Sequence, residues 1–253
     1  MINRVNSWLP VLTFHSIDDQ RSPISYPPSV FAQAVSYFKS RGCETIDLIS
    51  AVDMLRTSAV PKSSLVMTFD DGYESVYREA FPALLNQGMT ATVFLTVGLD
   101  RAISLDARLP SLHGRSMLSW RQIVEMKKSG VVSFGAHTLT HPDLTSLSAE
   151  RTEVELRDSK SIIEDALGCC VPAFAYPFGR YDDRCTTIAK RLFECACSDR
   201  LGLARVDSDS YALERVDAYY LRSVQTIRQV CSSSFPLYIS LRSIPRRIKR
   251  IFQ

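Results

Sequence analysis

Short apolar runs alternate along the chain with longer segments in which apolar residues recur every three or four positions. The short runs are rich in Val, Phe, Leu and Ala, a composition typical of buried strands. They predict strands at Val11–Phe14, Ser64–Phe69, Thr90–Val97, Val131–Ala136, Ala173–Tyr176 and Phe193–Cys197. Strands that alternate with helices in this way favour a parallel sheet or an α/β barrel.

The longer segments predict amphipathic helices with ordinary capping residues. Ser119 and Ser148 each precede a helical pattern and offer a side-chain oxygen to the free N–H groups of the first turn. Glycines that closely follow the last periodic residue predict left-handed C-caps at Gly42, Gly88, Gly130 and Gly168. The helices are predicted at Ser29–Ser40, Leu48–Arg56, Glu74–Asn86, Ser119–Ser129, Ala149–Leu167 and Asp183–Arg191.

The composition is that of one ordinary globular domain. The 253 residues are 45% hydrophobic and 23% charged, and α/β barrels of this length form single domains. The 10 glycines and 12 prolines follow no period, which excludes collagen-like and low-complexity chains. No run of 18 apolar residues occurs, so the sequence predicts no conventional transmembrane helix.

The net charge of +3 is unevenly distributed. After Asp217 the chain contains seven Arg or Lys residues and no Asp or Glu, so residues 1–217 carry a net charge of −4, seven below the total. We therefore expect a domain over residues 1–224 and a basic C-terminal tail over residues 225–253. The segment Leu241–Phe252 is either an amphipathic helix that contacts an anionic membrane surface or an acidic partner, or a solvated terminal helix. We expect no nucleic-acid partner, and the sequence leaves the oligomeric state open.

The seven cysteines do not form a recognisable disulfide framework. Their number is odd, Cys169 and Cys170 are adjacent, and no C-x-x-C pair occurs. The apolar stretch Trp8–Phe14 contains Pro10 and lacks a small-residue cleavage site, so we do not expect a secretion signal there. These features favour a cytoplasmic protein in a reducing compartment, with the basic tail able to reach the inner membrane face.

Two motifs place metal-ligating residue types after predicted strands. Asp70 and Asp71 follow Ser64–Phe69, and they serve one site only if the strand ends there and Gly72 turns the backbone. The alternative is an ordinary Asp-Gly turn. His137 and His141 follow Val131–Ala136, and on a helical turn their spacing places both imidazoles on one face, where they can bind a divalent ion. The alternative is a pair of exposed or capping histidines.

Three motifs in order resemble those of the polysaccharide deacetylase family, also known as the NodB homology domain or carbohydrate esterase family 4. They are Thr-Phe-Asp-Asp-Gly at 68–72, His-Thr-x-x-His-Pro at 137–142 and Phe-Ala-Tyr-Pro-Phe-Gly at 174–179, and the resemblance covers roughly 11–224. It implies a single-domain α/β fold, an irregular (β/α)7-type barrel. It also implies that Asp70 is the general base and that the backbone N–H of Phe178 stabilises the oxyanion. The metal ligands that it implies are Asp71, His137 and His141, with Zn²⁺ as the expected ion and Co²⁺, Ni²⁺ or Fe²⁺ as alternatives.

The sequence departs from the family pattern at two positions. Ala175 stands where the third motif normally has an arginine that orients the catalytic aspartate. Arg215 is our preferred substitute and Arg222 the second candidate, although Arg215 can equally be a surface residue paired with Glu214. No histidine follows His141, so the usual C-terminal general acid is missing.

His15 follows the first predicted strand and resembles the histidine of the permuted subgroup that includes poly-N-acetylglucosamine deacetylases. Because the first and last strands of a closed barrel are neighbours, His15 can take the place of a C-terminal histidine. We predict that His15 protonates the departing amine, and the alternative is a hydrogen-bonded core histidine.

The resemblance implies metal-dependent removal of N-acetyl groups from N-acetylglucosamine-type units of a polysaccharide or glycan precursor. Hydrolysis of a cyclic amide or an acetyl ester remains an alternative, as does a catalytically silent glycan-binding protein. The expected substrate contacts are Tyr73, Tyr176, Trp120 and Tyr181. Packing is the alternative for Trp120, and His113 is assigned no role.

Overall fold

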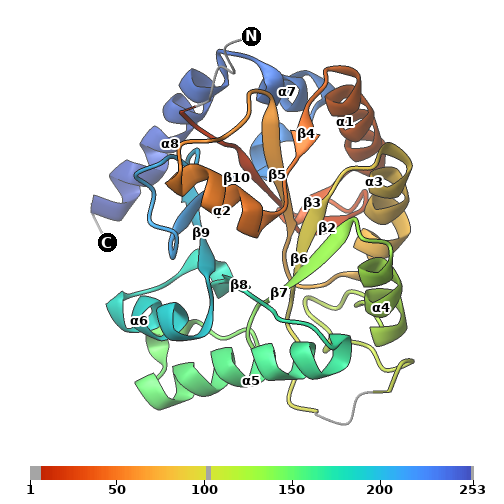
Figure 1. Cartoon of the computed structure of the whole chain (residues 1–253), viewed down its shortest axis with the longest axis vertical. Helices are drawn as coiled ribbons and strands as arrows, with labels where there is room; N and C mark the ends of the chain where they lie inside the picture. Colours follow the sequence, from red (N-terminus) through yellow and green to blue (C-terminus); the bar gives the residue numbers. More distant parts are fainter. Residues whose placement is uncertain (1–6, 101–103, 252–253) are drawn as a thin grey trace.

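Seven parallel strands form a closed barrel, which confirms the expected irregular (β/α)7 fold (Figure 1). The computed structural model describes residues 7–100 and 104–251. Around the ring the strands are β1 (Val11–Phe14), β10 (Leu213–Asp217), β9 (Cys195–Leu201), β8 (Ala173–Ala175), β7 (Val132–Ala136), β6 (Ala91–Leu95) and β5 (Ser64–Phe69). Strand β1 also pairs with β5, and this pairing closes the ring.

The register of the closing strands brings their C-terminal ends to one level. Val11–Phe14 of β1 pair in order with Val66–Phe69 of β5, and Thr13 pairs with Asp217 at the end of β10. His15 follows β1 and therefore lies beside the ends of both neighbouring strands. The first and last strands of the barrel are thus adjacent, as expected.

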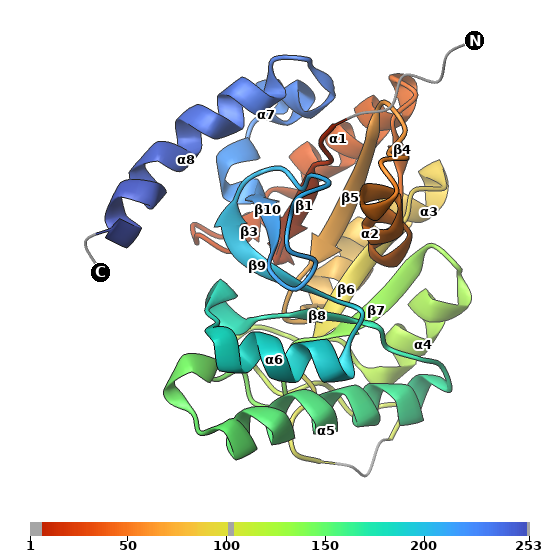
Figure 2. The same cartoon turned by 60° about the vertical axis from the view of Figure 1, so that its left-hand side comes forward.

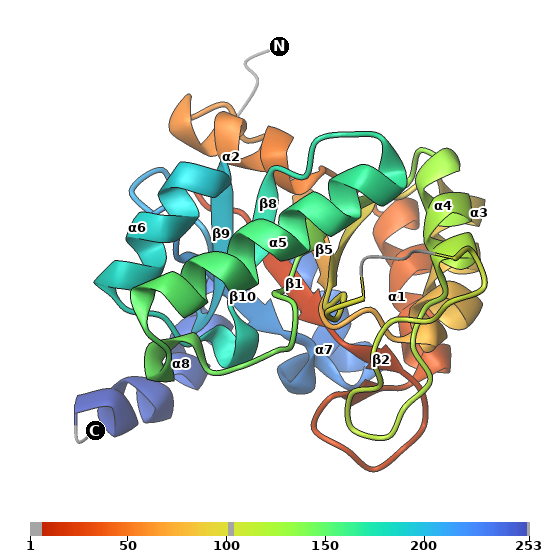
Figure 3. The ribbon, with the colours of Figure 1, turned by 90° about the horizontal axis from the view of Figure 1, so that it is seen from below.

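The main helices pack around the barrel. Figure 3 shows one of them, α5, running past the strands. Their caps match the sequence pattern. Ser119 and Gln122 form a reciprocal capping box, the Ser148 hydroxyl accepts a bond from Arg151 N–H, and the four predicted glycine caps have φ between 60° and 76°. The helices are α1 (Pro28–Ser40), α2 (Leu48–Arg56), α3 (Phe81–Gln87), α4 (Trp120–Lys128), α5 (Ala149–Leu167), α6 (Asp183–Leu192), α7 (Val224–Arg228) and α8 (Phe235–Ile251).

Alternation along the strands separates two apolar clusters. Leu12 and Phe14 of β1 belong to the larger cluster, which packs against the surrounding helices, whereas Val11 belongs to the smaller cluster inside the barrel. The interior also contains small residues of β8 and β9, including Ala175 and Cys197. Burial raises the pKa of Cys197 to about 12, so this thiol stays protonated at neutral pH and serves as a small apolar residue.

Most predicted elements match the structure within one or two residues at each end, and two differ more. The helix predicted at Glu74–Asn86 is a π-helix at Val76–Ala80 followed by α3, because Pro82 has no N–H and the Phe81 N–H bonds to the Val76 carbonyl instead. Strand β9 begins later than predicted and continues through polar residues to Leu201. Short strands were not predicted at β2 (Ser16–Ile17), β3 (Ser25–Tyr26) and β4 (Glu44–Thr45).

The segment after Val224 packs on the barrel, and the later part of α8 extends away from the barrel (Figure 2). Ile227, Val230, Phe235 and Ile239 are buried in the larger cluster. The other side of α8 exposes Leu237, Leu241 and Ile244. Within the described ranges, no helix combines the length and the hydropathy that crossing a membrane requires.

Candidate active site

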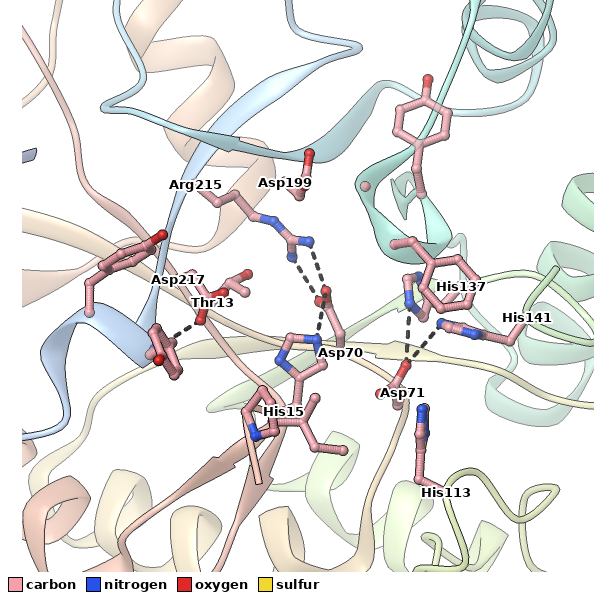
Figure 4. A pocket seen from close by; sticks show the side chains of 17 residues that line it. Thr13, His15, Asp70, Asp71, His113, His137, His141, Asp199, Arg215 and Asp217 are labelled. Carbon is pink, nitrogen blue, oxygen red and sulfur yellow. Dashed lines mark hydrogen bonds and ion pairs between the residues drawn. The ribbon is translucent and has the colours of Figure 1, made fainter. Parts of the chain in front are cut away.

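Side chains from several strand ends line one cavity of about 430 Å³ at the C-terminal end of the barrel (Figure 4). Parallel strands bring their C-terminal ends to the same side, which is where α/β barrels carry their chemistry. The residues contributed by strand ends and the loops that follow them include His15, Asp70, Asp71, His137, His141, Phe178, Asp199, Arg215 and Asp217.

A buried ion pair joins Asp70 to Arg215. The two terminal nitrogens of Arg215 each lie 2.7 Å from a different oxygen of Asp70, and both side chains are 4% exposed. The Arg215 Nε donates to the Ser198 carbonyl at 2.9 Å. Burial raises the pKa of Asp70, but the Arg215 guanidinium outweighs that effect and holds the pKa below its usual value. Asp70 is therefore an oriented, ionised carboxylate.

The position of Arg215 decides between the two alternatives that the sequence left open. Arg215 is not a surface residue, and Glu214 instead lies 3.6 Å from Arg200. Arg222, the second candidate, donates to backbone carbonyls around Ser22 and Ser25. Arg215 therefore contacts Asp70 as the missing motif arginine was expected to do.

His15 lies near the same carboxylate. Its Nε2 lies 3.9 Å from Asp70 Oδ2, and its side chain is 24% exposed in the cavity. The partial exposure leaves the ring open to the cavity, and the role of His15 as proton donor stays a prediction. The structure thus brings the predicted base and the predicted proton donor together.

Asp71, His137 and His141 form a compact set of potential metal ligands. Asp71 Oδ1 lies 3.4 Å from His137 Nε2 and 3.3 Å from His141 Nε2, and the three ligand atoms lie within 4.8 Å of one another. Asp71 Oδ1 is buried and has no hydrogen-bond donor that satisfies normal geometry. One carboxylate oxygen and two imidazole nitrogens are ligands that Zn²⁺ accepts, and they leave open positions. The described residues therefore fit a divalent ion.

The loop that carries the two histidines is not the helical turn that we predicted. Thr138 and His141 have positive φ angles of 73° and 58°, and these left-handed residues turn the backbone so that both Nε2 atoms face Asp71. His137 is oriented further by a 2.7 Å hydrogen bond between Nδ1 and the Ala175 carbonyl. Such strain at non-glycine residues persists only where the surroundings hold it.

Glu155 of α5 supplies much of that support. Its buried carboxylate accepts bonds from the backbone N–H groups of Leu139 and Thr140, both at 2.9 Å, and from the Thr140 hydroxyl at 2.7 Å. We did not predict this residue from the sequence. The sequence did contain a signal for Glu155. The apolar period of α5 places position 155 toward the core, and a buried carboxylate requires hydrogen-bond partners.

Phe178 lies in a tight turn at the cavity wall. Its φ is 56°, and its ring lies edge-on to His141 with centroids 4.7 Å apart. Gly179 follows because a Cβ there would lie 2.1 Å from the Cβ of Asp199. The turn therefore places Phe178 in the cavity wall with its ring beside His141, and the oxyanion role of its backbone N–H stays a prediction.

Of the four aromatic residues predicted to contact substrate, the structure places Tyr73, Trp120 and Tyr181 away from the cavity, and we correct the prediction for these three. Trp120 and Tyr73 are buried in the core. Tyr176 borders the cavity, but its ring is buried and its hydroxyl donates to the Tyr211 carbonyl at 3.0 Å. Tyr181 stacks on Tyr176 and lines a different crevice. Large rings beside motif residues pack against the barrel because their burial is favourable.

Two tyrosines and a histidine that we did not predict line the cavity. Tyr219 and Tyr220 follow β10 and line the cavity, and Tyr219 is half exposed. His113, to which we assigned no role, also lines it, and Figure 4 shows its ring on the side of Asp71 away from the two ligand imidazoles. The sequence offered one signal for the two tyrosines as cavity residues, because they directly follow a strand. His113 lies in a long irregular loop and gave no such signal.

The fold and this cavity define an α/β barrel that carries one carboxylate and two imidazoles, a set of potential metal ligands, at the ends of its strands. The model of the polysaccharide deacetylase family matches residues 57–193. YxkH of Bacillus subtilis (strain 168), which has the provisional name of a polysaccharide deacetylase, is 30% identical over 210 residues, covering 82% of this chain and 70% of that protein. The chain belongs to the polysaccharide deacetylase family.

Two further comparisons concern named deacetylases. A poly-beta-1,6-N-acetyl-D-glucosamine N-deacetylase of Staphylococcus aureus (strain MSSA476) is 25% identical over 215 residues, covering 80% of this chain and 71% of that protein. The structure of the Streptococcus pyogenes deacetylase PplD in complex with acetate superposes with a TM-score of 0.79 at 26% identity, covering 89% of this chain and 98% of that chain.

We predict that Glu155 positions the metal ligands. Glu155→Ala leaves three donors of the histidine loop without an acceptor, so Zn²⁺ affinity falls about 10–100-fold in a chelator-competition titration. Glu155→Gln retains an oxygen for the two backbone N–H groups and recovers most of the affinity. Glu153→Ala, an exposed change on the same helix, is the matched control. A lower melting temperature with unchanged Zn²⁺ affinity contradicts the positioning role.

Proposed function

We propose that the protein is a divalent-metal-dependent deacetylase that removes N-acetyl groups from N-acetylglucosamine-type units of a glycan or glycan precursor. The observation that carries the proposal is the shared cavity in which the Asp71, His137 and His141 set lies beside the ionised Asp70–Arg215 pair. The named activity of the staphylococcal relative and the acetate complex of the streptococcal deacetylase support the choice of substrate.

The proposed metal would be held by Asp71, His137 and His141, with Zn²⁺ as the preferred ion. When bound, such an ion supplies a Lewis acid and lowers the pKa of a water ligand from 15.7 to about 7. The buried, unpaired Oδ1 of Asp71 and the two Nε2 atoms that face it are the features of this chain that favour the assignment.

The other residues divide the proton transfers between them. Asp70 accepts a proton from the attacking water, and Arg215 keeps its carboxylate oriented and ionised for that step. His15, in contact with Asp70 and open to the cavity, protonates the departing amine. The backbone N–H of Phe178 stabilises the oxyanion of the tetrahedral intermediate.

The central prediction concerns metal content and acetate release together. Purified protein reconstituted with Zn²⁺ should release acetate from N-acetylglucosamine oligomers, and chelation followed by Zn²⁺ addition should abolish and restore the activity. His137→Ala should lose more than the roughly 100-fold in Zn²⁺ affinity that removal of a supporting residue causes, and acetate release with it. Acetyl esters and cyclic amides belong in the same substrate panel. Turnover of those alone overturns the proposed substrate, and metal-independent acetate release overturns the mechanism.

A second prediction distinguishes the role of His15 from that of His113, the other cavity histidine outside the metal-ligand set. His15→Ala should lower kcat about 10²–10⁴-fold without changing Zn²⁺ content, because it removes the proposed proton donor and no metal ligand. His113→Ala is the matched comparison, since His113 lines the same cavity on the Asp71 side. A large loss in His113→Ala with little change in His15→Ala would assign the proton donor to His113 instead.

We also propose that α8 lies on an anionic membrane surface. Leu237, Leu241 and Ile244 are 64%, 60% and 47% exposed, and the same four–three spacing continues in the sequence to Ile248 and Ile251. Five Arg or Lys residues lie between Arg242 and Arg250, with no acidic residue. An exposed apolar stripe among basic residues is the pattern of a helix that binds anionic headgroups.

Vesicle sedimentation tests this surface. The protein should sediment with vesicles containing phosphatidylserine at low salt and less so with phosphatidylcholine alone. Leu237→Ser/Leu241→Ser should reduce binding several-fold, whereas Leu85→Ser, an exposed leucine of α3, should leave it unchanged. Equal binding by all three proteins, or dimerisation through the stripe without lipid binding, contradicts the proposal.

A further inference from the structure

Two cysteines far apart in the sequence lie in contact on the side of the barrel away from the metal-ligand set. Cys43 follows α1 and precedes β4, and Cys231 ends the turn between α7 and α8. Their Sγ atoms are 2.6 Å apart. This separation exceeds an S–S bond of about 2.04 Å by only about half an ångström. Among the described residues, no other two thiols are in direct contact.

The backbone around both residues is well supported. The Cys43 N–H donates to the Phe38 carbonyl at 2.9 Å, directly after the C-cap of α1. On the other side, Arg228 lies over the ring of Tyr37 at 5.0 Å, which ties α7 to α1. The two thiols therefore meet through the packing of their elements and not through a flexible loop.

The pair is also reachable. Both cysteines line a crevice of about 260 Å³ together with Lys62 and Ser232, and Cys231 is only partly buried. The contact between the thiols lowers the pKa of Cys43 against the effect of burial, with Arg41 acting in the same direction, and it raises the pKa of Cys231. Cys43 is therefore the thiol of the pair that ionises first. A lowered pKa increases the thiolate fraction, which is the nucleophile in disulfide exchange.

We propose that Cys43 and Cys231 form a reversible disulfide that fastens the C-terminal segment to the barrel. The oxidant is a small disulfide such as oxidised glutathione, or the disulfide form of a dithiol oxidoreductase. One protein thiolate attacks the donor disulfide and releases one thiol; the second protein thiolate attacks the mixed disulfide, closes the Cys43–Cys231 bond and releases the other thiol. Two protein thiols are oxidised, the donor is reduced to two thiols, and the two protons pass to the released thiolates.

A Cys43–Cys231 disulfide would restrain the C-terminal segment, which contacts a residue of the cavity wall. Phe235 of α8 packs near Trp8, and the Tyr238 hydroxyl donates to the Tyr220 carbonyl at 2.8 Å. Tyr220 in turn lines the cavity. A cross-link at Cys231 therefore restrains the start of α8 and, through Tyr238, the loop after β10.

The effect on stability is expected to be large because the cross-link closes a long loop. The two cysteines are separated by 188 positions, and such loops lie at the upper end of disulfide stabilisation in the chain-entropy account. For a domain of this size the melting temperature should rise roughly 5–15 °C on oxidation. The proposal does not depend on the proposed enzymatic activity.

The test compares the oxidised and reduced forms of the full chain. Protein equilibrated with oxidised glutathione is denatured, alkylated, digested and analysed by mass spectrometry, and a peptide cross-linking Cys43 to Cys231 is expected. Its melting temperature should exceed that of protein treated with a reductant. Cys43→Ser and Cys231→Ser should each abolish this difference, and each variant is compared with itself so that any loss of packing cancels.

Cys170→Ser, an exposed change outside the pair, is the matched control and should keep the full shift. Both thiols remaining free in excess oxidised glutathione overturns the proposal, as does a cross-link that joins other cysteines. A cross-link that forms without any change in melting temperature contradicts the fastening role. Acetate release measured on both forms reports separately on the proposed function, whose failure would leave the cross-link result unaffected.

Discussion

The pairing of β1 with both β5 and β10 is the constraint on which the site depends. It closes the ring and sets the ends of three strands side by side, so that His15, Asp70 and Arg215 approach one another although up to 200 positions separate them. Without that closure Asp70 would be a buried carboxylate without its cation, which is unfavourable by several kcal/mol. Barrel closure and the ionised state of Asp70 are therefore linked.

Local backbone conformation in the loops after the strands also positions the site residues. Asp71, Thr138, His141 and Phe178 all have left-handed φ angles, and all lie in or beside the metal-ligand set. Each such residue costs about 1–3 kcal/mol when it is not glycine. The Glu155 carboxylate offsets part of this cost by holding the histidine loop in place. The site is built from strained turns on a rigid frame.

Much of this arrangement could be predicted from the sequence, because it depends on local pattern. Apolar runs located six of the seven barrel strands but not β10. The Asp-Asp-Gly and His-x-x-x-His motifs located the residues that the structure brings together around Asp71. The conformation of 137–141 could not be predicted, since four-residue spacing fits both a helical turn and a loop with two left-handed residues. Trp120 and Tyr73 were misplaced because an aromatic ring beside a motif has the same sequence signature whether it faces the core or a cavity. Glu155 and the Cys43–Cys231 contact depend on tertiary packing, which one sequence does not reveal.

Arg215 on β10 supplies the buried cation beside Asp70. Ala175, at the position of the family's usual arginine, lies on β8 and is a small residue of the interior cluster. Moving the cation from one strand to the other by single substitutions passes through a protein with either two crowded cations or none. During divergence, positions 175 and 215 should therefore exchange Ala and Arg only as a coordinated pair. Once the exchange has occurred, reversal is disfavoured, because the protein with two arginines and the protein with none are both less stable.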